Sequence, residues 1–237
     1  MYRAGQTHLM YQVPQEKIIS YQQNFPDELH IDTYFGTYYY RINTKQKILK
    51  DKKIRQALSY AIDRRKIVNK VTKGGQVPAF SFSPPDPQNF FPTTKLPFDP
   101  EKARSLLRMS GYPGGEGFPK LELLYNTSEG HQKVAQAVQQ MWKINLNIDV
   151  ELVNVDWQVY LDREKSGDFF ISRAGWIGDY PDANSFLDMM VTGRGNNKTG
   201  WGNEEYNNLI KKAAESASLE ERYSFFNKAE HILMEEL

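Results

Sequence analysis

Two carboxylates, a tryptophan and an arginine lie close together in one short segment that reads RAGWIGDYPD. The carboxylates belong to Asp179 and Asp182, and the other two side chains are Arg173 and Trp176. A carboxylate can transfer protons, cap a helix, or pair with a cationic group of a ligand. An indole beside it offers an apolar wall with one hydrogen-bond donor. The segment 173–182 is therefore the first candidate for a functional site.

This segment lies between two elements of different kinds. The preceding residues 168–172, DFFIS, are typical of a short buried strand, and an apolar pattern of helical spacing begins near Asp182. We therefore expect a glycine-rich loop that leaves the carboxyl end of a strand and enters a helix. Because ligands bind at the carboxyl ends of strands in open α/β sheets, this placement favours a binding site.

The two aspartates have different expected roles. We interpret Asp182 as a helix cap, and an exposed aspartate that follows glycine, such as Asp179, is commonly a turn former. A functional role for Asp179 is favoured by its company, which is Trp157 on the preceding predicted helix together with Trp176 and Arg173. A hydrolase that uses the two aspartates as an acid–base pair would need a defined separation and one raised pKa. Three residues of spacing in a Gly- and Pro-containing loop ensure neither, so this enzyme hypothesis is the weakest.

Common catalytic motifs are absent from the sequence, which contains no GxSxG, HExxH or GxxxxGK[ST] pattern. The four histidines lack the spacing of metal ligands, and there is no cysteine. Disulfides, thiol nucleophiles and cysteine-based zinc sites are therefore excluded. We expect a protein that is not an enzyme and that carries no metal and no cofactor.

The composition is that of an ordinary globular protein, with 40% hydrophobic and 25% charged residues among 237. Lys and Arg number 30 against 29 Asp and Glu, so the net charge of +1 offers no field for nucleic acid or a membrane surface. Nucleic acid is therefore not an expected partner. Aromatic residues reach 13%, and tyrosine and tryptophan suit binding surfaces because each has an apolar body and a polar end.

Periodicity and capping residues predict the elements that must position this segment. Strands are predicted at 7–13, 29–42, 121–125, 148–153 and 168–172. Helices are predicted at 14–22, 51–62, 63–73, 99–110, 157–165 and 186–190, after Thr127 or Ser128, and twice after 203, the last opening with a Ser218–Glu221 capping box. From 121 onward the order is β-α-β-α-β-α-α-α, which predicts a sheet flanked by helices. Residues 76–98 hold six prolines and are expected to be irregular.

Three consecutive tyrosines, Tyr38, Tyr39 and Tyr40, fall in the predicted strand 29–42. Because side chains alternate along a strand, Tyr39 must face the opposite side from its two neighbours. Two interpretations stay open at this point. The strand can be covered on both faces, or the Tyr39 hydroxyl can line a cleft.

Five segments carry a resemblance to a known family, the oligopeptide-binding proteins of ABC importers, which are large bilobed solute-binding proteins. The segments are LHIDTYFGTYYYRIN at 29–43, KKIRQALSYAIDRRKIVNKV at 52–71, LLYNTSEGHQKVA at 123–135, VNVDWQVYLD at 153–162 and RAGWIGDYPDANSFL at 173–187. The last segment is the most specific, and the likeness runs almost from end to end of the chain.

The resemblance implies an α/β fold, in the form of a periplasmic-binding-protein-like (type II) lobe whose mixed sheet is flanked by helices. It assigns residues 1–35 to the edge segment of the first lobe. Residues 36–237 would form the second peptide-binding lobe, with the C-terminal return strands missing. We therefore interpret the chain as a piece of a longer protein.

In proteins like these an extended peptide lies between the lobes and is held largely through its backbone. Carried over by position, Asp179 is similar to the carboxylate that pairs with the peptide's α-ammonium group. Main-chain groups of Gly175 and Ile177 are expected to pair with the peptide main chain, while Trp157 and Trp176 wall its side-chain pockets. The remaining implied positions are two cleft tyrosines, two groups for the peptide carboxylate, an asparagine and a loop: Tyr34 and Tyr39; Arg173 and His131; Asn126; and Asn197 to Thr199.

The sequence departs from the family pattern at three places. Glu164 stands where such proteins often carry an arginine, and Arg41 stands where they carry a glutamate. Ile177-Gly178 replaces a Cys-Ala pair before the key aspartate. These departures concern the accepted peptide length and the pocket preferences more than the amine-binding role of Asp179.

The resemblance implies a monomer that binds oligopeptides in an inter-lobe cleft and delivers them to the membrane permease of an ABC importer. Its location would be periplasmic or extracellular, with or without a lipid anchor. A related solute-binding protein for a cell-wall peptide, a metal chelate or haem is the alternative. An aspartate placed to receive an ammonium group favours peptides over these solutes.

Overall fold

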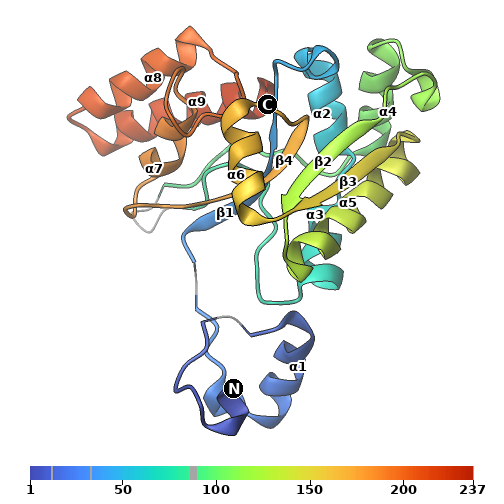
Figure 1. The fold of residues 1–237 in the computed structure, drawn as a ribbon. Coiled ribbons are helices and arrows are strands. Elements are labelled where there is room, and N and C mark those ends of the chain that lie inside the picture. The colour runs from blue at the N-terminus through green and yellow to red at the C-terminus, as the bar shows by residue number, and fades with distance from the viewer. Residues whose placement is uncertain (12, 33, 86–89, 237) are drawn as a thin grey trace.

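The computed structural model describes residues 1–11, 13–32, 34–85 and 90–236, and a mixed β-sheet forms its centre (Figure 1). Its strands are β1 (Gly36–Ile42), β2 (Leu121–Asn126), β3 (Val150–Val155) and β4 (Ile171–Ile177), in the order β1-β4-β2-β3. Strand β1 runs antiparallel to β4, whereas β2 runs parallel to both β3 and β4. The predicted α/β fold with a mixed sheet is therefore confirmed.

The helices begin where capping residues allow them to begin. Asp51, Asp63, Asp99 and Asp156 each accept a hydrogen bond from a backbone N–H in the first turn of the helix that follows. The helices are α1 (Gln15–Asn24), α2 (Lys52–Tyr60), α3 (Arg64–Lys66, continued by a π-helical turn at Ile67–Thr72), α4 (Pro100–Met109), α5 (Glu129–Leu146), α6 (Trp157–Ser166), α7 (Asn184–Leu187), α8 (Glu204–Glu215) and α9 (Leu219–Glu236). The predicted order of elements from 121 onward is confirmed.

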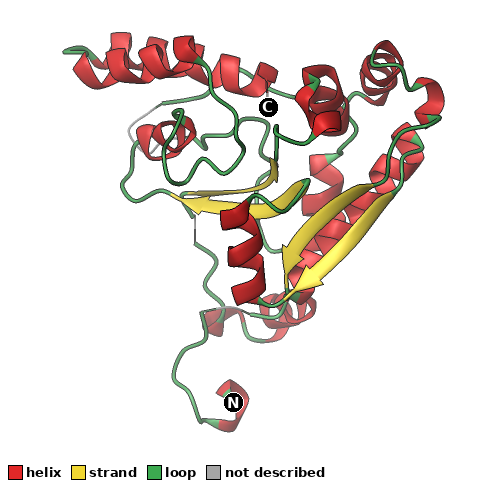
Figure 2. Cartoon of the chain, turned by 45° about the horizontal axis from the view of Figure 1, so that its top comes forward, coloured by secondary structure: helices red, strands yellow, loops and turns green. Residues whose placement is uncertain are grey.

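Helices cover both faces of the sheet, and each face has its own hydrophobic core (Figure 2). On one face α2, α4 and α5 pack on the strands, with Trp142 and Leu123 fully buried between them. On the other face α7, α8 and α9 enclose a second core around Phe186 and Phe226. Strand β1 contributes to both cores, because Tyr40 packs against the first and Tyr39 against the second. The predicted alternation of the tyrosines is therefore confirmed.

Three strand predictions differ from the structure. The described residues of 7–13 form no strand, and within 29–42 the strand begins only at Gly36. The strand predicted at 168–172 is β4, which begins at Ile171 and continues to Ile177, so that half of the expected loop 173–182 is strand. The reason is pairing, because β1 lies beside every residue of β4 from Ile171 to Ile177. The loop itself starts at Gly178.

The irregular segment 76–98 was expected, and its described residues form no helix or strand. It nevertheless contributes to the interior, since Phe82, Phe90 and Leu96 are buried. The N-terminus and helix α1 lie apart from the sheet in Figure 1. No helix in the described part of the chain is both long and apolar enough to cross a membrane.

Candidate functional site

Most of the predicted site residues lie at one end of the sheet. Strands β2 and β4 are parallel, so their carboxyl ends meet at the same edge, and the antiparallel β1 begins there with Gly36 opposite Ile177. Asn126 ends β2, His131 lies in the first turn of α5, and Trp157 begins α6. Such an edge is where ligands bind in α/β sheets.

Asp179 lies in the loop of residues 178–184, which we call the Asp179 loop. Its side chain is exposed, and no Lys, Arg or His of the described residues lies within ion-pair distance of its carboxylate. Its backbone N–H, in contrast, donates to Ser185 Oγ at 2.8 Å. The backbone is therefore fixed while the carboxylate is free to meet a cation.

Asp182 has the opposite situation in the same loop. Both of its carboxylate oxygens lie 2.8 Å from Nη2 of Arg222 on α9, and Oδ1 also accepts the backbone N–H of Asn184 at 2.8 Å. Asp182 therefore has a structural role, but the predicted helix cap is wrong in detail, because the N-cap of α7 is Ala183, which follows Asp182. A carboxylate held by an arginine is a poor partner for acid–base chemistry with Asp179, so the hydrolase hypothesis is not favoured.

The backbone of β4 leaves an open edge beside this loop. Strand β2 pairs with β4 only at Ile171 and Ser172, and no other described strand lies along that side. The carbonyl oxygen of Arg173 accepts a hydrogen bond from the Tyr160 hydroxyl on α6, whereas Gly178 N–H donates to Phe35, which precedes β1.

Backbone groups alternate in direction along an antiparallel strand. Those of Gly175 and Ile177 therefore point the same way as those of Arg173, away from β1. Both residues are exposed, so their N–H and C=O groups can pair with an added strand. A Cβ atom at Gly175 would lie no closer than 3.8 Å to any heavy atom beyond the two neighbouring residues, so there is free space above the strand at this position.

Arg173 has aromatic and amide neighbours in place of an acidic one. Its guanidinium lies 5.1 Å from the centre of the Tyr38 ring, and Nη1 lies 3.5 Å from Asn126 Oδ1. Within the described ranges no carboxylate forms an ion pair with it, and its buried Nε has no hydrogen-bond partner. A half-buried cation with spare donors is suited to an anionic group.

His131 completes this cluster, with Nδ1 3.5 Å from the Tyr38 hydroxyl. Burial lowers the pKa of His131 to about 4, and the positive charge of Arg173 contributes to the same shift. The imidazole is therefore neutral near pH 7, and it can donate one hydrogen bond without adding charge. Tyr38, which joins His131 to Arg173, was not among the predicted site residues, although the alternation of the three tyrosines contained the signal.

The two tyrosines that were predicted as site residues lie away from this cluster. Tyr39 faces the second core, where its ring contacts Phe82 edge-on at 5.0 Å and its hydroxyl lies 4.0 Å from Met189 Sδ. Tyr34 precedes β1 and is 73% exposed. Of these two residues, Tyr34 can contact a ligand without a movement of the core, and Tyr39 cannot.

Both tryptophans flank the open edge of β4. Trp157 is 54% exposed and stacks on Tyr160, with ring centres 5.5 Å apart and planes 15° from parallel. Trp176 is half-buried, and its Nε1 donates to the Ser185 carbonyl oxygen at 2.7 Å. The two indoles are thus held by neighbouring groups, as walls of a site should be.

Asn197 and Thr199 lie away from the other predicted residues. Asn197 Nδ2 donates to the carbonyl oxygens of Met190 and Trp201, and the carbonyl of Thr199 accepts two hydrogen bonds from Thr44. Thr44 follows the far end of β1, which is roughly 20 Å from Gly36 at the rise of a strand. The structure therefore uses both residues to hold the loop 191–203 and does not bring them to Asp179.

Two of the three positions that depart from the family pattern, Arg41 and Glu164, form an ion pair with each other. Both side chains are nearly buried, with 10% and 11% of their surface exposed. The Ser172 hydroxyl donates at 2.7 Å to the same oxygen of Glu164 that Arg41 contacts, and the Tyr160 hydroxyl lies 2.6 Å from it, its single proton being shared between this oxygen and the Arg173 carbonyl oxygen. Glu164 is therefore neutralised internally, and it is not an exposed negative charge beside the site.

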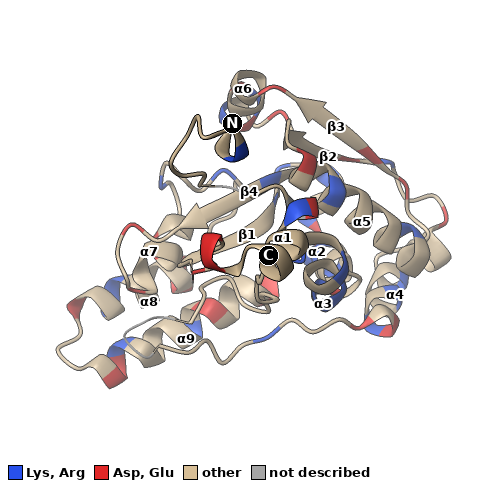
Figure 3. Cartoon of the chain, turned by 90° about the horizontal axis from the view of Figure 1, so that it is seen from below, with Lys and Arg blue, Asp and Glu red and all other residues tan. Residues whose placement is uncertain are grey.

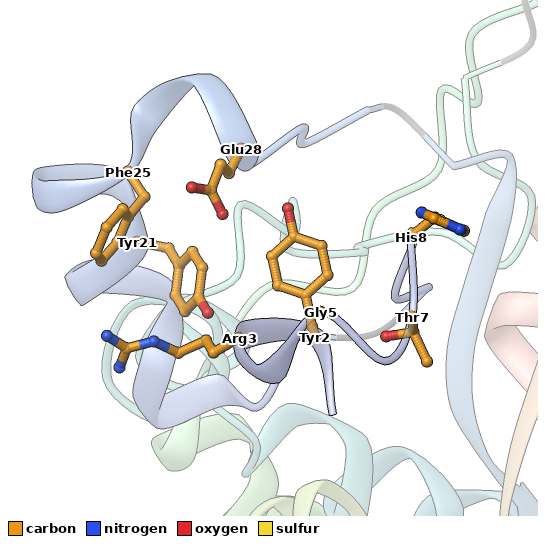
Figure 4. Close-up of a pocket in the computed structure, with 8 residues that line it drawn as sticks. All are labelled: Tyr2, Arg3, Gly5, Thr7, His8, Tyr21, Phe25 and Glu28. Atoms are coloured by element: carbon orange, nitrogen blue, oxygen red, sulfur yellow. The ribbon is translucent and has the colours of Figure 1, made fainter.

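Other parts of the surface contain fewer features of a binding site. The N-terminal segment contains a pocket of about 480 Å³ (Figure 4), lined by Tyr2, Arg3, Gly5, Thr7, His8, Tyr21, Phe25 and Glu28, none of which was predicted as a site residue. No group of three or more His, Cys, Asp or Glu in the described residues could hold a metal ion. Acidic and basic residues are intermixed over the helices in Figure 3, in keeping with the net charge of +1.

Comparison with known proteins places these features in a family. Residues 1–198 match the family described as bacterial extracellular solute-binding proteins, family 5 Middle. The chain is 37% identical over 234 residues to the oligopeptide-binding protein OppA of Bacillus subtilis (strain 168), an alignment that covers 95% of this chain and 43% of that protein. It is 36% identical over 242 residues to the periplasmic murein peptide-binding protein MppA of Escherichia coli (strain K12), with coverages of 99% and 45%.

The fold agrees with this likeness. The solved structure of Haemophilus influenzae OppA in complex with RPPGFSPFR has a TM-score of 0.92 and 32% identity to this chain, and the match covers 99% of this chain and 48% of that one. The chain thus spans less than half the length of these relatives, and its sheet and helices follow a periplasmic-binding-protein lobe. It belongs to family 5 of the bacterial extracellular solute-binding proteins.

Proposed function

We propose that this chain forms the second lobe of an oligopeptide-binding protein, with residues 1–35 at the edge of the first lobe and 36–237 in the second. The observation that carries the proposal is the open edge of β4, which leads directly to a carboxylate without a described ion-pair partner. An extended peptide added to that edge would pair its main chain with Gly175 and Ile177. Its α-ammonium group would then reach Asp179.

The charge of Asp179 suits this role for a physical reason. An ammonium–carboxylate hydrogen bond in a closed, water-poor cleft is far stronger than an ion pair on an open surface. Main-chain pairing is independent of the peptide's side chains, so the same site tolerates many sequences. Trp157 and Trp176 would then contact the side chains of the bound peptide as apolar walls.

The peptide's carboxylate would be received by the cluster at the end of β2. Arg173 supplies the positive charge there, and His131 supplies a neutral donor beside it. Glu164 would not repel the carboxylate, because Arg41 already neutralises it. Tyr34 and Asn126 are proposed as further contacts, and the loop from Asn197 to Thr199 would take part only if the complete protein brings ligand near it.

The proposed protein acts as a non-enzymatic, monomeric carrier outside the cytoplasmic membrane, in the periplasm or anchored by lipid. It would deliver peptides to the permease of an ABC importer. The murein peptide-binding protein among its relatives keeps a cell-wall peptide as a candidate ligand. A cell-wall peptide with a free amino terminus would place its ammonium group in the same site.

Calorimetry on the full-length protein tests the proposal. A tripeptide should bind much more tightly than its N-acetylated form, because acetylation removes the charge that Asp179 receives. Asp179→Asn should remove most of this difference, at a cost of about 2 kcal/mol or more to binding of the free tripeptide. Asp149→Asn, an exposed aspartate before β3 at the other edge of the sheet, is the matched control and should change neither affinity. Equal affinity of the wild type for the two ligands would refute the ammonium site.

A further inference from the structure

Ser185 contacts two of the proposed ligand-binding residues at once. It is the second residue of α7 and only 6% exposed. Its Oγ accepts the backbone N–H of Asp179 at 2.8 Å, and its carbonyl oxygen accepts Trp176 Nε1 at 2.7 Å. One buried residue therefore sets the spacing between the carboxylate for the ammonium group and the indole beside it.

The interior of the protein fixes Ser185 itself. Its backbone N–H donates to the Asp182 carbonyl oxygen at 3.0 Å, and Asp182 is held by Arg222 through two contacts of 2.8 Å. The following residues, Phe186 and Leu187, are 0% exposed in the second core. Ser185 is thus a rigid support below an exposed loop.

The chain on the other side of Asp179 is held as well. Gly178 N–H donates to the carbonyl oxygen of Phe35 at 2.9 Å. A Cβ at Gly178 would lie 2.4 Å from Phe35 Cδ1 and 3.2 Å from Phe186 Cε2, so only glycine permits this approach. Two successive N–H groups are therefore tied down, and the Asp179 carboxylate is the part of this turn that is left to act on a ligand.

We infer that Ser185 is a positioning residue for the ammonium site: its hydroxyl fixes the Asp179 backbone, and thereby the direction of the carboxylate. Ser185 does not touch the ligand in this arrangement. The inference rests on the proposed function, because it gives Ser185 a role only if Asp179 binds an ammonium group. Preorganisation of this kind lowers the ordering cost of binding, so its loss should appear in affinity.

The test compares a tripeptide with its N-acetylated form in the full-length protein, for the variants Ser185→Ala, Ser185→Cys and Ser185→Thr. Loss of the hydroxyl in the alanine and cysteine variants should weaken binding of the free tripeptide roughly tenfold. Binding of the acetylated tripeptide should stay within a factor of two, because it does not use the Asp179 charge. Ser185→Thr keeps the hydroxyl and should retain most of the discrimination between the two ligands.

Two further variants separate positioning from general damage. In an Asp179→Asn background, Ser185→Ala should cause no additional loss of affinity, since the group it positions has been removed. Ser216→Ala removes the same hydroxyl from the end of α8, where it donates to the Lys212 carbonyl oxygen, and should bind both ligands as the wild type does. Thermal unfolding of each variant identifies any that is not folded, and Ser185→Cys, which keeps an atom at the position of the hydroxyl oxygen, then replaces the alanine variant.

Each outcome decides the inference. Equal weakening of both ligands by Ser185→Ala, or an unchanged ratio of the two affinities, would overturn the positioning role while leaving the ammonium site of Asp179 intact. A wild-type protein that binds both ligands equally would overturn the ammonium site and the role of Ser185 together. The two failures are therefore distinguishable in the same set of titrations.

Discussion

Two arginines on neighbouring strands show how this chain separates structural charge from charge that can bind. Arg41 on β1 and Arg173 on β4 point to opposite faces of the sheet. Arg41 is buried against Glu164, whereas the half-buried Arg173 lies over the Tyr38 ring and has no ion-pair partner in the described part of the chain. Within the described residues, an arginine is therefore paired with a carboxylate at position 41 and not at position 173.

The difference follows from the cost of burying charge. A buried ion must be paired and hydrogen-bonded, or it destabilises the fold by several kcal/mol, so Arg41 requires Glu164. Arg173 retains contact with water, which allows it to remain unpaired until an anion arrives. Asp179 and Asp182 repeat the contrast at the other end of the site, because Arg222 holds only Asp182. The unpaired charges of Arg173 and Asp179 at the carboxyl ends of the strands are therefore the groups that we propose for ligand binding.

The largest expected effect on stability comes from breaking the ion pair between Arg41 and Glu164. Glu164→Ala leaves the Arg41 guanidinium buried without a carboxylate and should lower the free energy of unfolding by about 3–5 kcal/mol. Urea denaturation measures this loss. The exposed pair of Lys120 and Glu151 is the control, since Glu151→Ala should cost less than about 1 kcal/mol. A loss below about 1 kcal/mol for Glu164→Ala would show that the pair is not a structural requirement.

A second interior charge sharpens the comparison, because Glu230 on α9 is fully buried and no cation of the described residues pairs with it. It accepts hydrogen bonds from Phe82 N–H at 2.5 Å and from the Ser83 hydroxyl at 2.5 Å. Burial raises the pKa of Glu230 to about 7. Where Arg41 is neutralised by a partner, Glu230 is therefore neutralised by a proton only as the pH falls below about 7.

The sign of the resulting pH dependence is fixed. The pKa of Glu230 is higher in the folded than in the unfolded state, so its stabilising effect is complete below about pH 4.5 and is lost as the pH rises through about 7. In Glu230→Gln this dependence should vanish, which changes the stability difference between the two proteins by about 3 kcal/mol over that window. Urea denaturation at several pH values measures it. Parallel pH profiles for wild type and variant would contradict a raised pKa.

Substitution of Arg173 should affect ligand binding more than stability, whereas loss of the ion pair of Arg41 should affect stability. Arg173→Gln should leave the free energy of unfolding within about 1 kcal/mol of wild type and weaken tripeptide binding by about 2 kcal/mol. A tripeptide with an amidated C-terminus should be insensitive to the substitution, because it lacks the carboxylate. If Arg173→Gln unfolds the protein as readily as Glu164→Ala does, the distinction between the two arginines is wrong.

The smallest effect concerns the histidine beside Arg173. The pKa of His131 is lowered to about 4, so the imidazole contributes stability that is present above about pH 6.5 and is lost as the pH falls through about 4. An NMR titration of the ring should give a midpoint near 4 in the wild type. In Arg173→Gln the midpoint should rise toward 6.5, though not fully, since burial remains the larger cause. A wild-type midpoint above 6 would show that Arg173 and burial do not act on this ring.

The features that could be predicted from the sequence depend on residues close together in the chain or on the resemblance to the family. The helix starts at Asp51, Asp63 and Asp99 follow from a capping residue beside an apolar pattern. The position of Asp179 after a strand was predicted in the same local way. Its expected partners in the ligand came from the resemblance.

What could not be predicted depends on contacts between distant parts of the chain. The extension of β4 to Ile177 results from pairing with β1, and Glu164 finds Arg41 across 123 positions of sequence. Ser185 lies only six positions from Asp179, yet no residue pattern indicates that the loop between them folds back so that the Ser185 hydroxyl meets the Asp179 backbone. Each of these features appears only when the strands and helices are placed in space.

The most direct test of the open-charge account is a crystal structure of the full-length protein with a bound tripeptide. We expect the peptide's ammonium nitrogen about 2.8 Å from a carboxylate oxygen of Asp179, with the peptide main chain paired to Gly175 and Ile177. The pair of Arg41 and Glu164 should stay closed in that complex. An ammonium group more than about 4 Å from Asp179, or one held by a different carboxylate, would contradict the account.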